Sequence, residues 1–145
     1  MANLKEPLLD WNESNLINVI KSIKRNLSPD LLPKKFRKEN ELNPMYGHCH
    51  NVSGCLYTIF RSKNLHMYRA LDKFGIYHWW VQDNDDNIID ITESQYSLSE
   101  INRLHKIGKK SSILGFDYKV RVRKLTERVL EDIDESNKCD NNLHT

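Results

Sequence analysis

The chain has 145 residues, of which 22 are Lys or Arg and 20 are Asp or Glu, so its formal net charge is only +2 at pH 7. A chain of this length suits a single domain that buries a core without disulfides or metals. The near balance of charge gives no reason to expect nucleic acid or an anionic membrane as a partner. No apolar run approaches the roughly 20 residues of a membrane span, and residues 1–6 lack an apolar signal core.

Cysteine usage points to a reducing compartment. Cys49, Cys55 and Cys139 form an odd set in a chain without an evident export signal. Such a set favours reduced thiols over a disulfide framework. We therefore expect a cytoplasmic protein in which one thiol can be reactive.

The N-terminal third is predicted to be helical with polar connections. Apolar residues recur at helical spacing at Leu16, Ile17, Ile20 and Ile23. They predict a packing helix that Asp10 or Asn12 can cap and that ends before residue 28. Residues 28–33, bounded by prolines, predict a short helical turn, and the charged residues 34–44 predict a solvated connection.

A second amphipathic helix is predicted to begin at or just before Cys49. Val52, Leu56, Ile59 and Phe60 follow Cys49 at spacings of three, four and seven residues. The unpaired amide hydrogens and the positive end of the helix dipole in the first turn favour a thiolate over a thiol. Cys49 is therefore placed where a cysteine is primed to react.

The middle of the chain predicts an antiparallel meander. Residues 65–71, 76–82 and 87–91 are rich in aromatic and β-branched side chains, and turn-forming residues separate them. Alternation places His78 and Trp80 on one face of their strand. A hairpin centred on residue 84 would set His78 directly opposite Asp90, with Cβ atoms about 4.5–5.5 Å apart.

Cys49, His78 and Asp90 then stand in the order of a thiol-enzyme triad. Asp90 would orient the imidazole and stabilise its protonated form, and His78 would stabilise the thiolate and move protons. Taken singly, each residue is more simply explained as structural: a buried cysteine, a sheet histidine or a turn-capping aspartate. The three together carry the hypothesis.

Several residues near Cys49 in the sequence or the predicted sheet are candidates to bind the oxyanion or the substrate. The Cys49 amide is the natural first oxyanion donor, and Asn43 or Gln95 is the candidate second donor. His48, next to the nucleophile, joins this group as a candidate oxyanion or substrate contact. Trp80, on the His78 face, is a candidate wall of the site, although tryptophan more often serves the core.

Three segments carry a family resemblance. They are Gly47-His48-Cys49, His78-Trp79-Trp80 and Asp90-Ile91-Thr92-Glu93-Ser94-Gln95-Tyr96. Residues 46–96 resemble the core of the transglutaminase-like branch of the papain-like cysteine enzymes, and are particularly similar to the small YunG-like bacterial and phage proteins. The resemblance implies a helix packed on an antiparallel sheet and thiol hydrolase or acyl-transferase chemistry. The short spacing from Cys49 to His78 and the absence of evident calcium loops argue against protein cross-linking.

A zinc site is a second class of function that the residues around Cys49 suggest. Potential ligands cluster in this region, namely His48, Cys49, His50, Cys55 and His78. They lack the usual two-to-four-residue ligand spacing, and no companion Cys-x-x-Cys or His-x-x-x-His pair exists. We therefore expect neither a metal nor a cofactor.

The last third is predicted to return to helix. Ser97 or Ser99 can cap a segment with Leu98, Ile101, Leu104 and His105 on it, and residues 108–112 predict a basic loop. Leu125, Val129 and Ile133 predict a final amphipathic helix. Arg121, Arg123, Lys124 and Arg128 form a basic patch on it, most simply a solvated face. Residues 135–145 are polar and predict a flexible tail.

These patterns together predict one α+β domain over residues 1–134 of papain-like, transglutaminase-like type, with a nucleophile helix on an antiparallel sheet and flanking N- and C-terminal helices. The predicted activity is a cysteine hydrolase or acyltransferase that acts on a peptide, amide or isopeptide bond of a protein or peptide substrate through a thioester. The alternative is a catalytically inactive member of the fold that binds another protein, as a small phage-encoded modulator would. The sequence leaves the substrate and the oligomeric state open.

Overall fold

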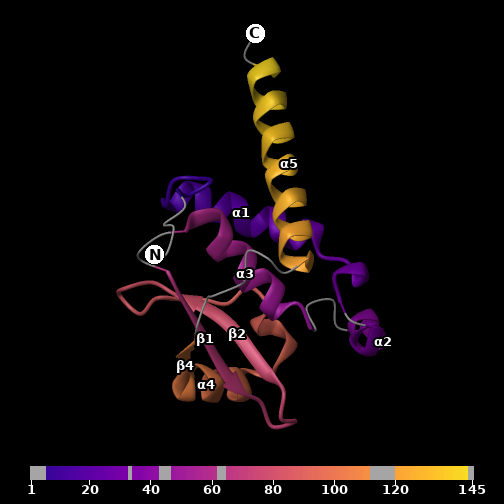
Figure 1. Ribbon diagram of the computed structural model, residues 1–145, viewed down its shortest axis with the longest axis vertical. Coiled ribbons are helices and arrows are strands. Elements are labelled where there is room, and N and C mark those ends of the chain that lie inside the picture. The colour runs from indigo at the N-terminus through magenta and orange to yellow at the C-terminus, as the bar shows by residue number, and fades with distance from the viewer. Residues whose placement is uncertain (1–5, 33, 43–46, 62–64, 112–119, 144–145) are drawn as a thin grey trace.

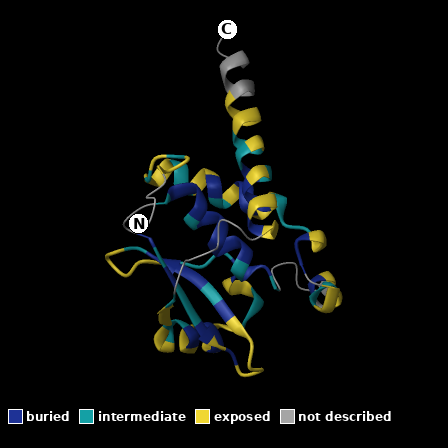
Figure 2. Ribbon diagram, in the orientation of Figure 1, coloured by how far each residue is buried: buried dark blue, intermediate teal, exposed yellow. Residues whose placement is uncertain are grey.

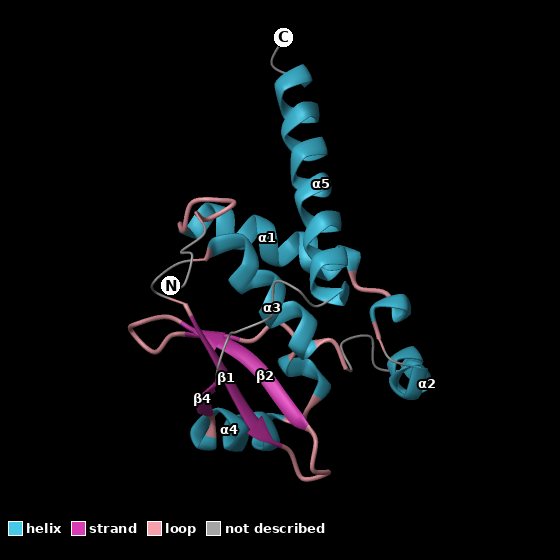
Figure 3. Cartoon of the chain, in the orientation of Figure 1, coloured by secondary structure: helices cyan, strands magenta, loops and turns pink. Residues whose placement is uncertain are grey.

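The chain folds into an α+β architecture in which helices flank an antiparallel sheet (Figures 1 and 3). The structure is a computed structural model that describes residues 6–32, 34–42, 47–61, 65–111 and 120–143. The helices are α1 (Glu13–Asn26), η1 (Pro29–Leu31), α2 (Lys34–Leu42), α3 (Cys49–Phe60), η2 (Glu93–Gln95), α4 (Leu98–Ile107) and α5 (Val120–Leu143). The strands are β1 (His66–Leu71), β2 (Tyr77–Gln82), β3 (Ile88–Ile89) and β4 (Lys109–Ser111).

The sheet has the order β3-β2-β1-β4, and each neighbouring pair is antiparallel. A tight turn joins β1 to β2, because the Asp72 carboxylate accepts hydrogen bonds from the amides of Phe74 and Ile76 at 2.8 and 2.9 Å. Gly75 in this turn has φ +79°, a conformation that glycine adopts without strain. The hairpin places Ala70 opposite His78.

Each face of the sheet carries its own apolar core. One face packs against α3, which α5 covers in turn, and α1 packs against α5. The buried residues of this core include Ile23, Leu56, Ile59, Phe60, Met67, Val81, Leu125 and Val129. The other face packs against α4, with Ala70, Trp80, Ile101 and Leu104 buried together. Met67 and Val81 face one core while Ala70 and Trp80 face the other, as the alternation of side chains along a strand requires. Figure 2 shows α3 buried over most of its length, whereas α5 carries many exposed residues.

Several predicted helix boundaries are confirmed. The Asn12 side chain caps α1 by accepting from the Asn15 amide at 2.8 Å, and Ser97 caps α4 through the Glu100 amide. α3 begins at Cys49 as the apolar spacing predicted. In α1, Ile23 is buried whereas Ile17 is 43% exposed, so Ile17 lies off the packing face to which its spacing had assigned it.

Two predicted connections are regular elements, so these predictions were wrong. Residues 34–42 form α2 rather than a solvated connection, and this stretch is rich in Lys, Glu and Arg, which lose little side-chain entropy in a helix. Residues 109–111, predicted as part of a basic loop, form edge strand β4 on β1. Lysines suit a short edge strand because they discourage pairing with another chain.

The predicted register of the β2–β3 hairpin was also wrong. The structure pairs Val81 with Ile89 and Gln82 with Ile88, so the hairpin is centred on residue 85 and not on 84. The cause is the turn chemistry. Asp83 accepts the amides of Asp85 and Asn87, and Asp86 takes a positive φ of 61°, which together stabilise a longer loop.

The C-terminal helix continues past the boundary predicted at residue 134. α5 extends to Leu143, and its last turns project away from the body of the domain (Figure 1). The middle of α5 is tied to α1, because Asp132 of α5 accepts hydrogen bonds from Ser22 and Arg25 of α1. Within the described ranges, no helix has both the length and the apolar sequence that crossing a bilayer requires.

Gly108 ends α4 at a point of very close packing. A Cβ atom on this residue would lie 2.3 Å from Cζ2 of Trp80, well inside van der Waals contact. The indole of Trp80 is fully buried, and its Nε1 donates to Gln82 Oε1 at 2.8 Å. Glycine at 108 therefore leaves room for the largest side chain of the second core.

Candidate active site

Cys49 reaches the sheet at an edge of β2 that β3 leaves open. The carbonyl of Ile76 accepts from the Asp72 amide on the β1 side, so the next carbonyl, that of Tyr77, points to the opposite edge. Cys49 Sγ lies 3.9 Å from that carbonyl oxygen. β3 pairs only with the far end of β2, at residues 81 and 82, which leaves this position free for the thiol.

His78 lies between a thiol and a carboxylate. Its Nε2 is 2.6 Å from Asp90 Oδ2, with both side chains almost fully buried. The side chain of Cys49 also acts on the ring. Burial by itself would lower the pKa of His78, but the hydrogen bond to Asp90 and the presence of Cys49 raise it to about 9. The predicted His78–Asp90 contact is confirmed, and it forms although the register differs.

A second imidazole shares Asp90. His105 of α4 places Nε2 2.7 Å from Asp90 Oδ2 and packs edge-on against Trp80, with ring centroids 4.9 Å apart. Trp80 in turn stacks on His78 at 5.7 Å. Burial raises the pKa of Asp90, but the hydrogen bonds from His105 and His78 outweigh burial and keep the pKa below its ordinary value. Asp90 is therefore held ionised.

Sequence reasoning placed His105 on the α4 helix without a functional role. The contact of His105 with Asp90 depends on how α4 packs under the sheet, so the sequence gives only one weak indication of it. His105 lies in the last turn of the helix, where the helix dipole favours an imidazole.

Gln95 lies beside the same imidazole. Its Nε2 is 3.2 Å from His78 Nδ1 and 3.2 Å from Thr92 Oγ1, and its Oε1 accepts from the Gly47 amide at 3.3 Å. Asp90 occupies Nε2 of the imidazole, and the Gln95 amide lies at Nδ1, the nitrogen on which the thiol would act. The role of Gln95 as an oxyanion contact stays a prediction.

A cleft of about 250 Å³ reaches Cys49 and Gln95, whereas His78 and Asp90 lie buried behind them. Its lining residues are Phe36, Gly47, Cys49, His50, Asp72, Ile76, Tyr77, Trp79, Gln95 and Tyr96. Phe36, Tyr77, Trp79 and Tyr96 give it aromatic walls, and Cys49, Asp72 and Gln95 are among its polar groups. Pockets that bind small organic groups have this composition of apolar walls with a few polar groups.

Two of the predicted contacts do not line this cleft. His48 is fully buried and Trp80 has no exposed surface. The neighbouring Trp79 lines the cleft instead. The ring of Trp80 packs against the imidazoles of His78 and His105. Asn43, the other candidate oxyanion donor, lies outside the described residues.

His48 has an unusual environment at the N-terminal end of α3. Neither ring nitrogen has a hydrogen-bond partner among the described residues. Burial lowers the pKa of His48 to about 4, against a smaller raising effect of Asp30. The imidazole is therefore neutral at physiological pH and fills space as part of the core.

Of the remaining candidate metal ligands, Cys55 lies in the α1–α3–α5 core. Its burial raises the pKa of the thiol to about 12, which makes it unreactive. The described residues that could share a metal ion are instead His78, Asp90 and His105, whose ligand atoms lie within 4.8 Å of one another. Two imidazoles and a carboxylate form a donor set that zinc accepts.

Opposite pKa displacements predict a bell-shaped dependence of stability on pH. His48 has its folded pKa near 4 and an ordinary value of 6.5, so its contribution is complete above pH 6.5 and is lost as the pH falls toward 4. The pKa of His78 is about 9 in the folded protein, so His78 gives its full stabilisation below pH 6.5, and this stabilisation is lost as the pH rises through 9. For each histidine, the difference between the folded and ordinary pKa corresponds to on the order of 3 kcal/mol in the free energy of unfolding.

Urea unfolding at pH 4.5, 6.5 and 9 measures this dependence, and we expect the free energy of unfolding to peak near 6.5. His48→Leu should flatten the acid side, because a neutral apolar side chain replaces the buried imidazole. A wild-type free energy of unfolding that is constant across these pH values would contradict the assignment.

Comparisons of the chain with protein-family models, with curated proteins and with solved structures found no match. The resemblance of residues 46–96 to papain-like enzymes therefore stays a prediction.

Proposed function

We propose that this protein is a cysteine hydrolase or acyltransferase that cleaves a peptide, amide or isopeptide bond through a thioester on Cys49. The observation that carries this proposal is the buried His78 imidazole, 2.6 Å from the Asp90 carboxylate and beside the thiol at the start of α3. A thiol next to an imidazole that a carboxylate orients is the arrangement that activates a cysteine nucleophile. The papain-like type of the fold and a cytoplasmic setting belong to the same proposal.

The proposed reaction begins from an ion pair. In this pair His78 carries both ring protons, donating from Nε2 to Asp90 and from Nδ1 to the Cys49 thiolate, and the Gln95 amide turns from Nδ1 toward the site of the oxyanion. Sγ attacks the carbonyl carbon and forms a C–S bond, and the oxyanion accepts hydrogen bonds from the Cys49 amide and Gln95 Nε2. The tetrahedral intermediate breaks its C–N bond, and His78 gives its Nδ1 proton to the leaving amine.

The second half of the reaction releases the acyl group. Neutral His78 removes a proton from water, or from an acceptor amine, as its oxygen or nitrogen attacks the thioester. The C–S bond breaks, and the thiolate and imidazolium are restored. Asp90 stays ionised throughout, because two imidazoles donate to the same oxygen.

The direct test uses a library of fluorogenic peptide amides with the wild type, Cys49→Ala and Cys55→Ala. We expect Cys49→Ala to abolish turnover while the protein stays folded, and Cys55→Ala to retain turnover with a loss of about 1 kcal/mol in stability from the small core cavity. Equal turnover by the wild type and Cys49→Ala on any substrate would refute the nucleophile.

A metal analysis tests the competing use of the same cluster. Because His78, Asp90 and His105 could hold zinc, the purified protein should be assayed for metal before and after chelation. Stoichiometric zinc whose removal abolishes activity would replace the triad with metal chemistry. Full activity after chelation supports the triad.

A further inference from the structure

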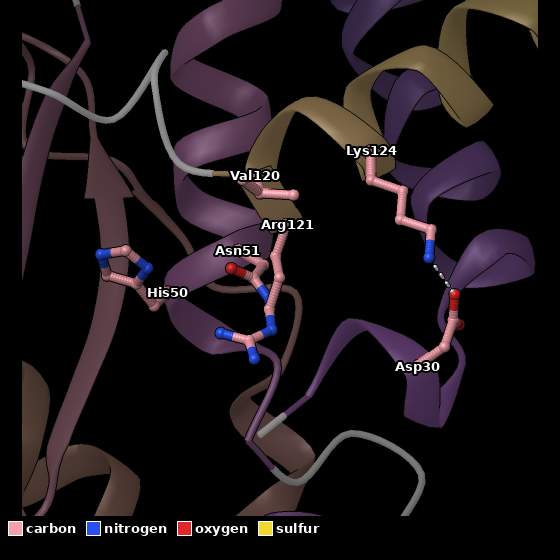
Figure 4. A pocket seen from close by; sticks show the side chains of 6 residues that line it. All are labelled: Asp30, His50, Asn51, Val120, Arg121 and Lys124. Carbon is pink, nitrogen blue, oxygen red and sulfur yellow. Dashed lines mark ion pairs between the residues drawn. The ribbon is translucent and has the colours of Figure 1, made fainter. Parts of the chain in front are cut away.

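Two hollows meet at the first turn of α3. The cleft that exposes Cys49 has His50 in its wall, and His50 also lines a second cavity of about 590 Å³. The other residues around that cavity are Asp30, Asn51, Val120, Arg121 and Lys124 (Figure 4). The two hollows are therefore neighbours, with His50 in the wall of each.

The two hollows differ in chemistry. At about 250 Å³ the first is smaller than the roughly 300–1,000 Å³ of most ligand pockets, so it suits a single side chain. Ile76, Tyr77 and Trp79 contribute apolar walls to it. His50 packs edge-on against Trp79, with ring centroids 5.0 Å apart, and forms the boundary between this apolar cleft and the second cavity.

The second cavity carries an excess of positive charge. Its one acidic lining residue, Asp30, pairs with Lys124 at 2.7 Å and with Arg128, and these contacts keep the pKa of Asp30 far below its ordinary value. Arg121 makes no hydrogen bond or ion pair with any other described residue. Figure 4 shows its guanidinium extending beneath the first turn of α3, beside Asn51.

The N-terminal ends of two helices add to the positive electrostatic potential of the second cavity. α3 begins at Cys49 and α5 begins at Val120, so both helices turn their N-terminal ends, the positive ends of their dipoles, toward this cavity. The amide of Asn51 is anchored by donating to the Leu31 carbonyl at 2.8 Å, which fixes the wall. Arg121, which pairs with no other described residue, thus stands in a setting that favours an anion.

We propose that the substrate is an acidic peptide segment, with an apolar residue in the Cys49 cleft and a nearby carboxylate side chain in the second cavity, where Arg121 binds it. This inference rests on the proposed function for the chemistry at Cys49. Binding, however, can be measured without turnover, so the two can fail separately.

The test measures dissociation constants of acetylated peptides with the full chain carrying Cys49→Ala. Each peptide contains one Phe and, one to four residues to either side, a Glu or in its matched partner a Gln. We expect at least one spacing at which Glu binds about fivefold more tightly than Gln, the effect of one partly solvent-exposed charge pair. The preference should shrink in 0.5 M NaCl.

Charge reversal at positions 121 and 123 tests whether the preference for Glu over Gln arises at Arg121. Arg121→Glu should invert the preference so that Gln binds better than Glu. Arg123→Glu is the matched control, because Arg123 is exposed on the same helix but does not line the cavity, and it should leave the preference intact. Replacing Phe by Gly in the peptide should weaken binding in every background.

Each outcome decides something distinct. Binding that is equal for Glu and Gln, or undetectable for every peptide, overturns the inference. Equal effects of Arg121→Glu and Arg123→Glu also overturn it, because they would indicate only the overall charge of α5. The predicted binding pattern without turnover by the wild type would uphold the acidic-peptide site and remove the proposed enzyme activity.

Discussion

Replacing His78 with alanine is expected to slow the alkylation of Cys49 by iodoacetamide about 30-fold at pH 7. An ion-paired cysteine is almost entirely thiolate at this pH, whereas an ordinary cysteine is only about 3% thiolate. Mass spectrometry of the alkylated peptides measures the rate at each cysteine across pH. In the wild type we expect fast labelling of Cys49 well below pH 8.5, and in the variant a dependence like that of a free thiol.

The other residues of the chain provide the controls for this measurement. Cys55 should label slowly in the wild type and in the variant, because it is fully buried. His66→Ala removes a histidine from β1 that bonds to Asn84 and does not line the cleft, so Cys49 should label at the wild-type rate. Slow labelling of Cys49 that does not depend on His78 would favour the inactive, protein-binding alternative.

Replacing Asp90 with asparagine is expected to lower kcat by about 10²–10⁴-fold with little change in KM. The carboxylate accepts from two imidazoles through one oxygen, and asparagine cannot stabilise the imidazolium as a carboxylate does. If its amide oxygen takes the place of Oδ2, its NH₂ group falls at Oδ1, which has no partner in the described structure. That buried donor should cost about 1–3 kcal/mol of stability.

His105 separates the electrostatic role of Asp90 from its structural role. His105→Ala removes one donor to Asp90 and should shift the pH profile of Cys49 labelling, whereas His105→Gln retains an N–H and should restore the wild-type profile. Thermal unfolding of the same variants reports the packing loss against Trp80. A labelling profile that is unchanged in both variants would limit His105 to packing.

Local patterns predicted the elements whose signals are local. The apolar spacing after Cys49 gave the start of α3, and the side chains of Asn12 and Ser97 marked the N-termini of α1 and α4. β1 and β2 were found from their composition, and the α+β class follows from these elements. The starts of these helices and the positions of β1 and β2 depend on side chains only a few residues apart, so they could be predicted without knowledge of tertiary packing.

Features that depend on distant contacts were missed. The edge strand β4 is two lysines and a serine that pair with β1, more than 35 positions earlier in the chain, and no local pattern reveals that pairing. The contact of His105 with Asp90 arises from the packing of α4. The contact of His78 with Asp90 was predicted, but for the wrong register: β3 ends at Ile89, so Asp90 meets His78 from outside the paired strand.

The site also shows why neighbours in sequence can have different roles. Alternation along β2 places Trp79 in the cleft wall and Trp80 in the second core, so the candidate wall residue was off by one position. His48 lies inside the domain while Cys49 and His50 line the cleft, because the first turn of α3 sends successive side chains in different directions.

The close packing of Gly108 against Trp80 predicts that these two positions vary together among related sequences. Trp80 lies between the rings of His78 and His105, so a side chain at 108 would push the indole against both imidazoles that share Asp90. Variation at position 108 should then be accepted only when position 80 becomes smaller. Among proteins that keep Cys49, His78 and Asp90, paired change at these two sites would identify those that preserve the working geometry.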